Sequence, residues 1–343
     1  MTKLDLKNVI MITCIAVGLV SVGCRKEPRE WNIVETEEVW NDVNDIYVVG
    51  QENSTQGTMM AKLWINGKGQ ELTDGTHSAM ANSVYVFGND VYITGSEWKE
   101  QGGWIVRLWK NGIMQHFDIA DDIYSCVANS VYVSGNDVYV AGEVYIPNKK
   151  GIATLWKNGV AQYLTDGTSA ARANSVYVSG SDVYVAGTGV ECNDTMCGLT
   201  LAKLWKNGIE HNLTDTYGSY ANSVYVAGNS VYVAGGSSDN VATLWKNGIA
   251  QNLTDGTHKA EARSVYVSGN DVYVTGGKID FPYEPILWKN GVAQNLKNGY
   301  MAYSVSVSGS NVYVCGGSQF WKNGKTLKLS ATRTCEALCV FVK

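Results

Sequence analysis

Seven positions hold the side chains that could perform chemistry in this chain. Six stand three residues before a recurring Ser-Val-Tyr-Val-like segment, and the seventh stands just before the last apolar run. They are Met80, Val127, Arg172, Tyr220, Glu261, Met301 and Glu336. Two carboxylates that act together can perform acid–base catalysis, so Glu261 and Glu336 are the candidate pair and Arg172 is the candidate cation. The alternative interpretations of these seven positions are that they form a ring of ligand contacts or that they belong to a variable solvated loop.

No established catalytic motif accompanies these residues. The nucleophile-elbow, zinc-protease, P-loop and EF-hand spacings are all missing from the sequence. The four histidines fall in different repeats, and none has a paired nucleophile; they are His77, His116, His211 and His258. The sequence therefore predicts no enzyme and no cofactor.

The N-terminal segment has the features of an export signal. Two lysines precede a run of 15 apolar residues (9–23), which is too short to cross a bilayer comfortably as a helix. Ser, Val and Gly then lead into Cys24, and this passage resembles the lipobox of bacterial lipoproteins. The resemblance implies a signal peptide over 1–23, a lipid on Cys24 and a charged tether over 24–37. It also implies a lipid-anchored protein of the bacterial cell envelope, at the outer membrane or cell surface rather than the inner membrane; an ordinary cleaved signal is the alternative.

The cysteines fit an oxidising compartment. Cys192 and Cys197 share one short loop, Glu-Cys-Asn-Asp-Thr-Met-Cys-Gly, and we expect a disulfide between them. The sequence does not determine the pairing of Cys126, Cys315, Cys335 and Cys339. No histidine stands at metal-ligand spacing from a cysteine, so no metal site is predicted.

A repeated phrase determines the expected fold. Its clearest copy, over 129–165, has four short apolar runs, and its third run contains Leu-Trp-Lys-Asn-Gly or a close variant. The repeated Trp occurs at Trp64, Trp109, Trp156, Trp205, Trp245, Trp288 and Trp321. Gly-Asn or Gly-Ser separates the first two runs and Asn-Gly the last two, which predicts tight hairpins. Four antiparallel strands in each of seven units predict an all-β, seven-bladed β-propeller over residues 38–343.

The repeat also resembles kelch-like propellers. Its second run ends in Gly, its third contains Trp, and three units carry the kelch double Gly, at Gly235-Gly236, Gly276-Gly277 and Gly316-Gly317. A propeller must join its first and last blades to avoid exposed strand edges. We expect Ala-Leu-Cys-Val-Phe-Val (337–342) to complete blade one, and Glu-Val-Trp-Asn (38–41) is the alternative.

Strand direction assigns the loops to two ends of the propeller. The hairpin between the first and second runs and the hairpin between the third and fourth runs lie at one end of the propeller. The loops that join the second run to the third, and the fourth run to the next unit, vary between repeats and lie at the other end, where binding residues are expected. The repeated Trp residues are predicted to fill the space between blades, each with a local acceptor for its indole N–H. A ring of lysines beside the hairpins is predicted to keep edge strands solvated.

Composition narrows the function. The chain has 343 residues, 45% apolar and 17% charged, with a net charge of −5, which does not fit a nucleic-acid-binding protein. The leading hypothesis is a monomeric, membrane-anchored lipoprotein that binds a protein or glycan through its variable loops without catalysis. The alternatives are a glycan-active lyase or hydrolase at the channel mouth and a scaffold subunit of an envelope assembly complex.

Overall fold

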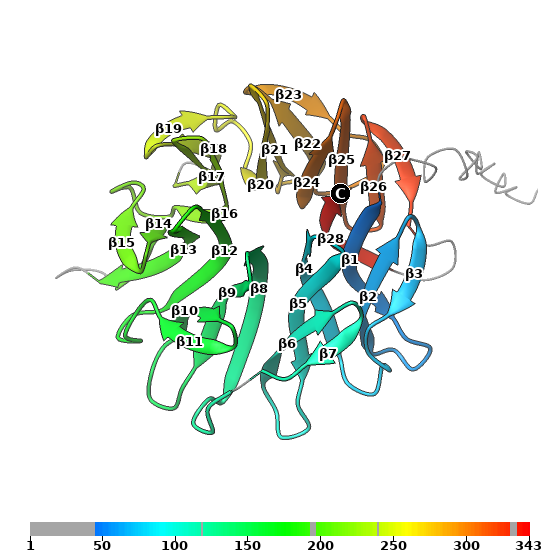
Figure 1. Ribbon diagram of the computed structural model, residues 1–343. Coiled ribbons are helices and arrows are strands. Elements are labelled where there is room, and N and C mark those ends of the chain that lie inside the picture. Colours follow the sequence, from blue (N-terminus) through cyan, green and yellow to red (C-terminus); the bar gives the residue numbers. More distant parts are fainter. Residues whose placement is uncertain (1–44, 118, 193–196, 239, 330–334) are drawn as a thin grey trace, which may run out of the picture. The chain divides into compact units, whose positions relative to one another are not determined.

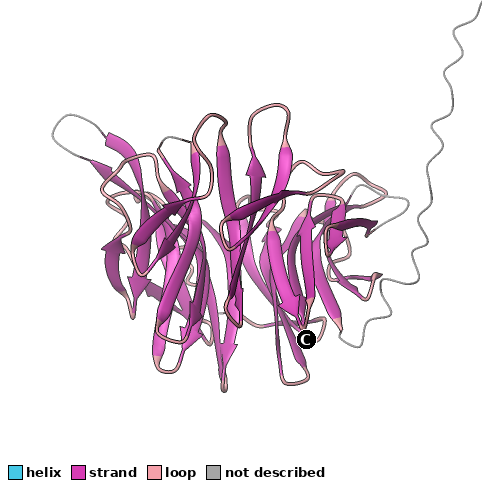
Figure 2. Cartoon of the chain, turned by 90° about the horizontal axis from the view of Figure 1, so that it is seen from above, coloured by secondary structure: helices cyan, strands magenta, loops and turns pink. Residues whose placement is uncertain are grey.

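The computed structural model describes residues 45–343 except 118, 193–196, 239 and 330–334. These residues form seven four-stranded antiparallel sheets arranged as a ring, which confirms the predicted seven-bladed propeller (Figure 1). Strands and loops alone make up this part of the chain, with loops at both ends of the strands (Figure 2), and it has no helix that could span a membrane. Cys24, the signal peptide and the tether lie outside the described residues.

Every sheet uses its four strands in the same order from the centre outwards (Figure 1). The inner strands are β28 (Cys335–Val342), β4 (Ala79–Phe87), β8 (Ser125–Ser134), β12 (Ala171–Ser179), β16 (Tyr220–Ala227), β20 (Ala260–Ser268) and β24 (Ser304–Ser308). The second strands are β1 (Ile46–Asn53), β5 (Asp90–Trp98), β9 (Asp137–Tyr145), β13 (Asp182–Cys192), β17 (Ser230–Ser237), β21 (Asp271–Lys278) and β25 (Asn311–Gly316). The third strands are β2 (Met59–Ile65), β6 (Trp104–Lys110), β10 (Ile152–Lys157), β14 (Cys197–Lys206), β18 (Val241–Lys246), β22 (Glu284–Lys289) and β26 (Gln319–Lys322). The outer strands are β3 (Lys68–Glu71), β7 (Ile113–Gln115), β11 (Val160–Tyr163), β15 (Ile209–Asn212), β19 (Ile249–Asn252), β23 (Val292–Asn295) and β27 (Lys325–Lys328).

The Asn-Gly pairs form the predicted hairpins between third and outer strands. Asn158 and Gly159 both have positive φ, 51° and 83°, which matches the twist of a two-residue hairpin. The Asn158 side chain also accepts a hydrogen bond from the Val138 amide (2.8 Å) and donates one to Asp137 (2.7 Å). The same residue therefore forms the turn and ties it to the neighbouring second strand.

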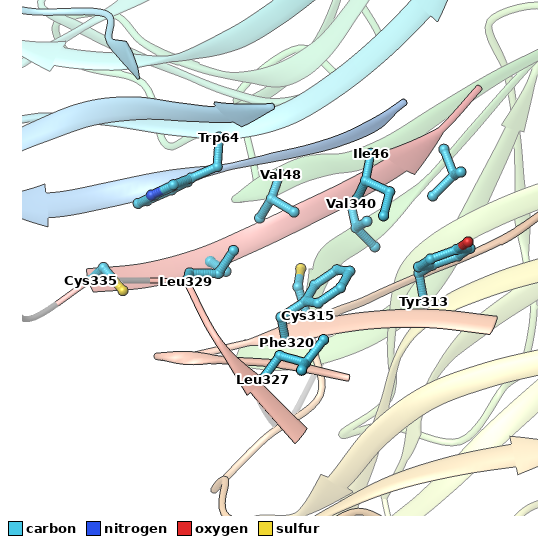
Figure 3. Close-up of a cluster of buried hydrophobic side chains, with 12 residues drawn as sticks. Ile46, Val48, Trp64, Tyr313, Cys315, Phe320, Leu327, Leu329, Cys335 and Val340 are labelled. Atoms are coloured by element: carbon cyan, nitrogen blue, oxygen red, sulfur yellow. The ribbon is translucent and has the colours of Figure 1, made fainter. Parts of the chain in front are cut away.

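The C-terminal strand closes the ring, as predicted. β28 pairs with β1 from Ile46↔Val342 to Glu52↔Cys335, so the first sheet has the order β28-β1-β2-β3. Side chains of this sheet and of the neighbouring seventh sheet share one buried cluster, in which Val340 packs among Ile46 and Cys315 (Figure 3). The alternative closing segment, 38–41, lies outside the described residues.

The repeated Trp residues fill the spaces between neighbouring sheets. All seven are at most 2% exposed, and Trp205, for example, belongs to a cluster with Leu155 of the preceding sheet. The expectation of a local indole acceptor holds for Trp205, which donates to Glu210 (3.1 Å). It is wrong for Trp245 and Trp288, whose indole nitrogens have no hydrogen-bond partner in the described part of the chain.

Repeated polar side chains join neighbouring inner strands. The Ser130 hydroxyl accepts a hydrogen bond from the amide of Val176 in the next inner strand (3.2 Å), and five other serines make the same bond; they are Ser83, Ser175, Ser223, Ser264 and Ser304. At the seventh interface Cys339 occupies the serine position. One recurring hydrogen bond thus joins neighbouring inner strands at six interfaces.

Four lysines of the predicted ring beside the hairpins are neutralised within their own blades. Lys110, Lys157, Lys206 and Lys289 each lie 2.7–2.8 Å from an aspartate on the adjacent second strand. Each ammonium also sits 5.2–5.4 Å from the centroid of a tyrosine ring. The charges of these four lysines are therefore paired within their own blades.

Candidate functional site

The seven positions singled out in the sequence are brought to one level of the ring, and we call them the mouth residues. In five sheets the mouth residue lies near the start of the inner strand, opposite the residue that follows a second-strand glycine, as in Val127↔Glu143 and Arg172↔Thr188. Glu336 on β28 is likewise opposite Gln51. Met301 lies three residues before the start of β24 and is buried.

In each sheet a glycine on the second strand leaves space for the backbone carbonyl of the mouth residue. A Cβ added at Gly50 would lie 1.8 Å from the carbonyl oxygen of Glu336, and one at Gly276 would lie 1.9 Å from that of Glu261. Both glycines have ordinary φ values, so the requirement is space, not a left-handed conformation. The inner strand then bulges by one residue, and in four sheets the bulged residue is an Asn whose side chain donates to a carbonyl of the next inner strand.

Arg172 does not meet the carboxylates predicted for it. Its guanidinium lies 2.8 Å from Glu143, a carboxylate on β9 of the preceding sheet that is only 5% exposed. The Tyr145 hydroxyl donates to the other oxygen of Glu143 (3.0 Å). Burial, and then the Glu143 charge, raise the pKa of Tyr145.

Glu261 is neutralised by a cation on its own strand. Arg263, the bulged residue of β20, donates to Glu261 Oε1 (2.5 Å), and the Tyr220 hydroxyl donates to Oε2 (3.3 Å). Tyr220 lies across Gly236, where a Cβ would come within 2.5 Å of its ring. Burial, and then the Glu261 charge, raise the pKa of Tyr220 well above its usual value.

Glu336 has neutral partners instead. Gln51 Nε2 donates to Glu336 Oε2 (2.9 Å), and the Tyr300 hydroxyl donates to Oε1 (3.1 Å). Tyr303 donates in turn to the Tyr300 hydroxyl (3.4 Å), and the Arg263 guanidinium lies 5.7 Å from the centre of the Tyr303 ring. Burial raises the pKa of both tyrosines.

The candidate site is therefore a chain of polar contacts and not a carboxylate pair. In the described part of the chain, the contacts that connect Glu261 to Glu336 run through Arg263, Tyr303 and Tyr300, and no hydrogen bond joins the two carboxylates directly. The predicted triple of Arg172 with these two carboxylates is not formed. Met80 and Val127 supply apolar surface at the same level, whereas Met301 is buried.

Four partners of the mouth residues were missed in the sequence: Gln51, Glu143, Arg263 and Tyr300. Arg263 could have been found, because it replaces the Asn that four other units carry at the bulge. There Asn82, for example, donates to the Ala128 carbonyl of the next inner strand (2.7 Å). Glu143 and Tyr300 reach the site from other strands and connections, and no spacing in the sequence indicates that.

Further along the inner strands, tyrosine rings stack around the inner wall. Tyr85, Tyr132, Tyr177, Tyr225 and Tyr266 follow one another with ring centres 4.4–5.0 Å apart. Phe341 continues the series from Tyr85 at 5.1 Å, and Ser306 takes the remaining position. Burial, and then the neighbouring Tyr225, raise the pKa of Tyr266 to about 12.

A separate polar cleft of about 490 Å³ lies beside the connection from β11 to β12. Its charged lining residues are Asp166, Glu191, Lys203 and Glu210. Lys203 is 5% exposed and donates to Glu191 (2.9 Å), Glu210 (2.5 Å) and Asn212 (3.0 Å). All three ammonium hydrogens are used within the cleft, so Lys203 offers a ligand no free donor.

The histidine contacts do not form a catalytic triad. His77 lies 3.6 Å from Glu100 and 3.2 Å from the Thr76 hydroxyl, but that hydroxyl donates to Asp74 (2.7 Å). His258 repeats the arrangement with Asp280, and both histidines are on exposed loops. These contacts belong to the repeated turn, where Asp side chains cap their own backbone.

The cysteines were only partly predictable. Cys192 and Cys197 lie opposite each other in register at the ends of β13 and β14. The disulfide expected between them remains a prediction. The four cysteines that the sequence left unpaired carry free thiols; they are Cys126, Cys315, Cys335 and Cys339. Among the described residues no group of three or more His, Cys, Asp or Glu is placed to hold a metal.

Comparison with known proteins matches the propeller fold at low sequence identity. No protein-family model and no curated protein matches the sequence. Solved structures do match, although identity is 10–12%. A puromycin-hydrolysing peptidase from Mycobacterium tuberculosis superimposes over 85% of this chain and 52% of its own length (TM-score 0.56, 11% identity). An acylaminoacyl peptidase from Pyrococcus horikoshii does so over 84% and 51% (TM-score 0.51, 12% identity).

A third match is a propeller on its own. The β-propeller domain of the Trilobed protease from Pyrococcus furiosus superimposes over 84% of this chain and 94% of its own length (TM-score 0.52, 10% identity). That propeller is described as having an open velcro topology, whereas β28 and β1 share a sheet here. This chain spans about half the length of the two peptidases.

These matches correct the function expected from the sequence. The non-enzymatic module that binds a protein or glycan through its variable loops was wrong, because the propellers that superimpose on this one are parts of peptidases. The glycan-active enzyme and the envelope scaffold are set aside by the same finding. The absence of catalytic motifs led to the wrong hypothesis, because a propeller that is one part of an enzyme need not contain them.

Proposed function

We propose that this chain is the propeller component of a peptidase. In this proposal the mouth residues receive peptide-like substrates, and a hydrolase component outside the described residues supplies the catalytic groups. The observation that carries the proposal is the superposition of 84–85% of the chain on propellers of peptidases, in two of which it accounts for about half of the protein.

The sequence and the site agree with this division of labour. The chain has no nucleophile-elbow motif, and its histidine–carboxylate contacts are exposed turn contacts. The mouth offers carboxylates, hydroxyls and apolar side chains at one level, which suits a ligand with both a polar backbone and apolar side chains.

Affinity purification from the source organism tests the proposal. The tagged chain is captured, and the eluate is assayed for hydrolysis of aminoacyl and peptidyl p-nitroanilides. We expect activity that co-elutes with the chain and is missing when an unrelated seven-bladed propeller is the bait. An eluate no more active than the control, from a lysate that contains such activity, would contradict the proposal. Hydrolysis by the recombinant chain alone would contradict the division of labour.

Lipid attachment at Cys24 is a separate proposal about location, supported by the sequence of the N-terminal segment alone. Metabolic labelling with a radioactive or alkynyl fatty acid should mark the wild-type chain in the cell envelope. The Cys24→Ser variant should take no label and leave the membrane fraction. Equal labelling of both proteins would refute it.

A further inference from the structure

One carboxylate near the mouth differs from its neighbours in the charge of its partner. Four glutamates on the second and inner strands are each paired with a lysine or arginine: Glu52 with Lys62, Glu97 with Arg107, Glu143 with Arg172 and Glu261 with Arg263. Glu336 receives hydrogen bonds from Gln51 and Tyr300, both neutral. Within the described residues no ion pair joins Glu336 to a cation, so its negative charge is uncompensated.

The amide of Gln51 is also incompletely satisfied. Its nitrogen donates to Glu336, whereas its oxygen, Oε1, is buried and has no hydrogen-bond partner in the described part of the chain. A buried acceptor without a donor costs about 1–3 kcal/mol. A ligand that donates hydrogen bonds to both Gln51 Oε1 and Glu336 would recover that cost.

The aromatic residues leave one ring available beside this carboxylate. Tyr300 and Tyr303 meet edge to face, with ring centres 6.2 Å apart, and the Arg263 guanidinium already stacks on Tyr303. Tyr300 is 45% exposed and lies against Gly317, where a Cβ would be 2.7 Å from its ring. An exposed tyrosine beside a carboxylate is an environment that favours a cation.

We propose that Glu336, Gln51 and Tyr300 form a binding site for a primary ammonium group. An ammonium has three donors and one positive charge, which matches a carboxylate oxygen, the free amide oxygen and the exposed ring of Tyr300. Ca²⁺ would need six to eight oxygen ligands, and the described residues hold no cluster of three acidic, histidine or cysteine side chains. The inference rests on the proposed function and specifies its substrate class: peptides or amides with a free amino group, from an N-terminus or a lysine side chain.

Calorimetric titration of the purified full chain with three probes tests the site. The probes are trialanine amide, its N-acetylated form, and Nα-acetyl-lysine amide. We expect trialanine amide, or the lysine derivative, or both, to bind at least 10-fold more tightly than the acetylated peptide. The first two probes distinguish an N-terminal from a side-chain ammonium. Equal binding of all three, or no binding of either amine, would overturn the proposal.

Variants separate the charge from the fold. Glu336→Gln keeps the shape of the side chain, removes its charge and replaces one acceptor oxygen with an N–H donor, so it should abolish the preference for the free amine. Glu100→Gln, at an exposed carboxylate on the β5–β6 loop, is the matched control and should retain it. An amine preference that persists in Glu336→Gln would contradict the proposal.

A pH titration of the wild-type chain gives an answer even if that variant does not fold. An α-amino group loses its proton near pH 8, so binding of trialanine amide should weaken by about 10-fold between pH 7 and pH 9. Binding that is independent of pH would again overturn the proposal. None of these assays measures hydrolysis, so amine binding without an associated peptidase would leave the site intact and refute only the proposed function.

Discussion

The contact between Gly50 and the Glu336 carbonyl gives the sharpest prediction about how the ring is closed. Gly50→Ala would place a Cβ 1.8 Å from that oxygen, more than 1 Å inside the closest approach that real side chains show. β1 and β28 would have to separate, although they are the two strands that join the ends of the ring. Overpacking of this kind costs about 1–3 kcal/mol, and each ladder hydrogen bond that is lost adds about 1 kcal/mol.

We therefore expect Gly50→Ala to lower the free energy of unfolding by about 3–5 kcal/mol. The matched control is Gly135→Ala, whose Cβ would meet nothing within 4 Å and whose φ of 59° costs only about 1–2 kcal/mol. Urea unfolding followed by tryptophan fluorescence measures both variants, because the seven repeated Trp residues are buried. For about 300 ordered residues, 3 kcal/mol corresponds to about 5 °C in Tm. A Gly50→Ala variant no less stable than the control would refute the closing contact.

Three further predictions concern the wall, the blades and the cysteines. Trp205→Ala should lower the free energy of unfolding by about 3–5 kcal/mol in the same urea assay, because it empties a buried site between two blades; a loss under 1 kcal/mol would contradict that placement. The raised pKa of Tyr266 stabilises the fold fully below pH 10, and this contribution is lost as pH rises through about 12. Unfolding free energy should thus fall more steeply from pH 10 to 12 in the wild type than in Tyr266→Phe, and identical slopes would refute the effect. Alkylation under denaturing, non-reducing conditions followed by mass spectrometry should leave Cys192 and Cys197 unlabelled, and label at both would exclude their disulfide.

The blades could be predicted from the sequence because each one repeats the same local chemistry. Asn-Gly turns such as Asn158-Gly159 form a hairpin wherever they occur, and the buried Trp marks the third strand of each sheet. Closure was predictable because 337–342 has the apolar pattern of an inner strand with no partner in its own unit.

The site was only partly predictable, because its contacts cross between blades. The mouth residues were identified as one level of the ring, but Arg172 pairs with Glu143 of the preceding sheet and Glu336 with Gln51, 285 positions away. The β-bulge redirects Arg263, so simple alternation along the strand does not indicate where its side chain points. Function was less predictable still, because the motifs of catalysis are not in the repeat and a fold alone does not specify an activity.

A crystal structure of the chain with trialanine amide tests the central claim most directly. We expect the peptide at the mouth of the ring, with its ammonium within about 3 Å of a Glu336 oxygen and of Gln51 Oε1. A peptide bound in the cleft beside Lys203, or elsewhere on the propeller with the mouth unoccupied, would contradict the claim that the mouth residues receive the substrate.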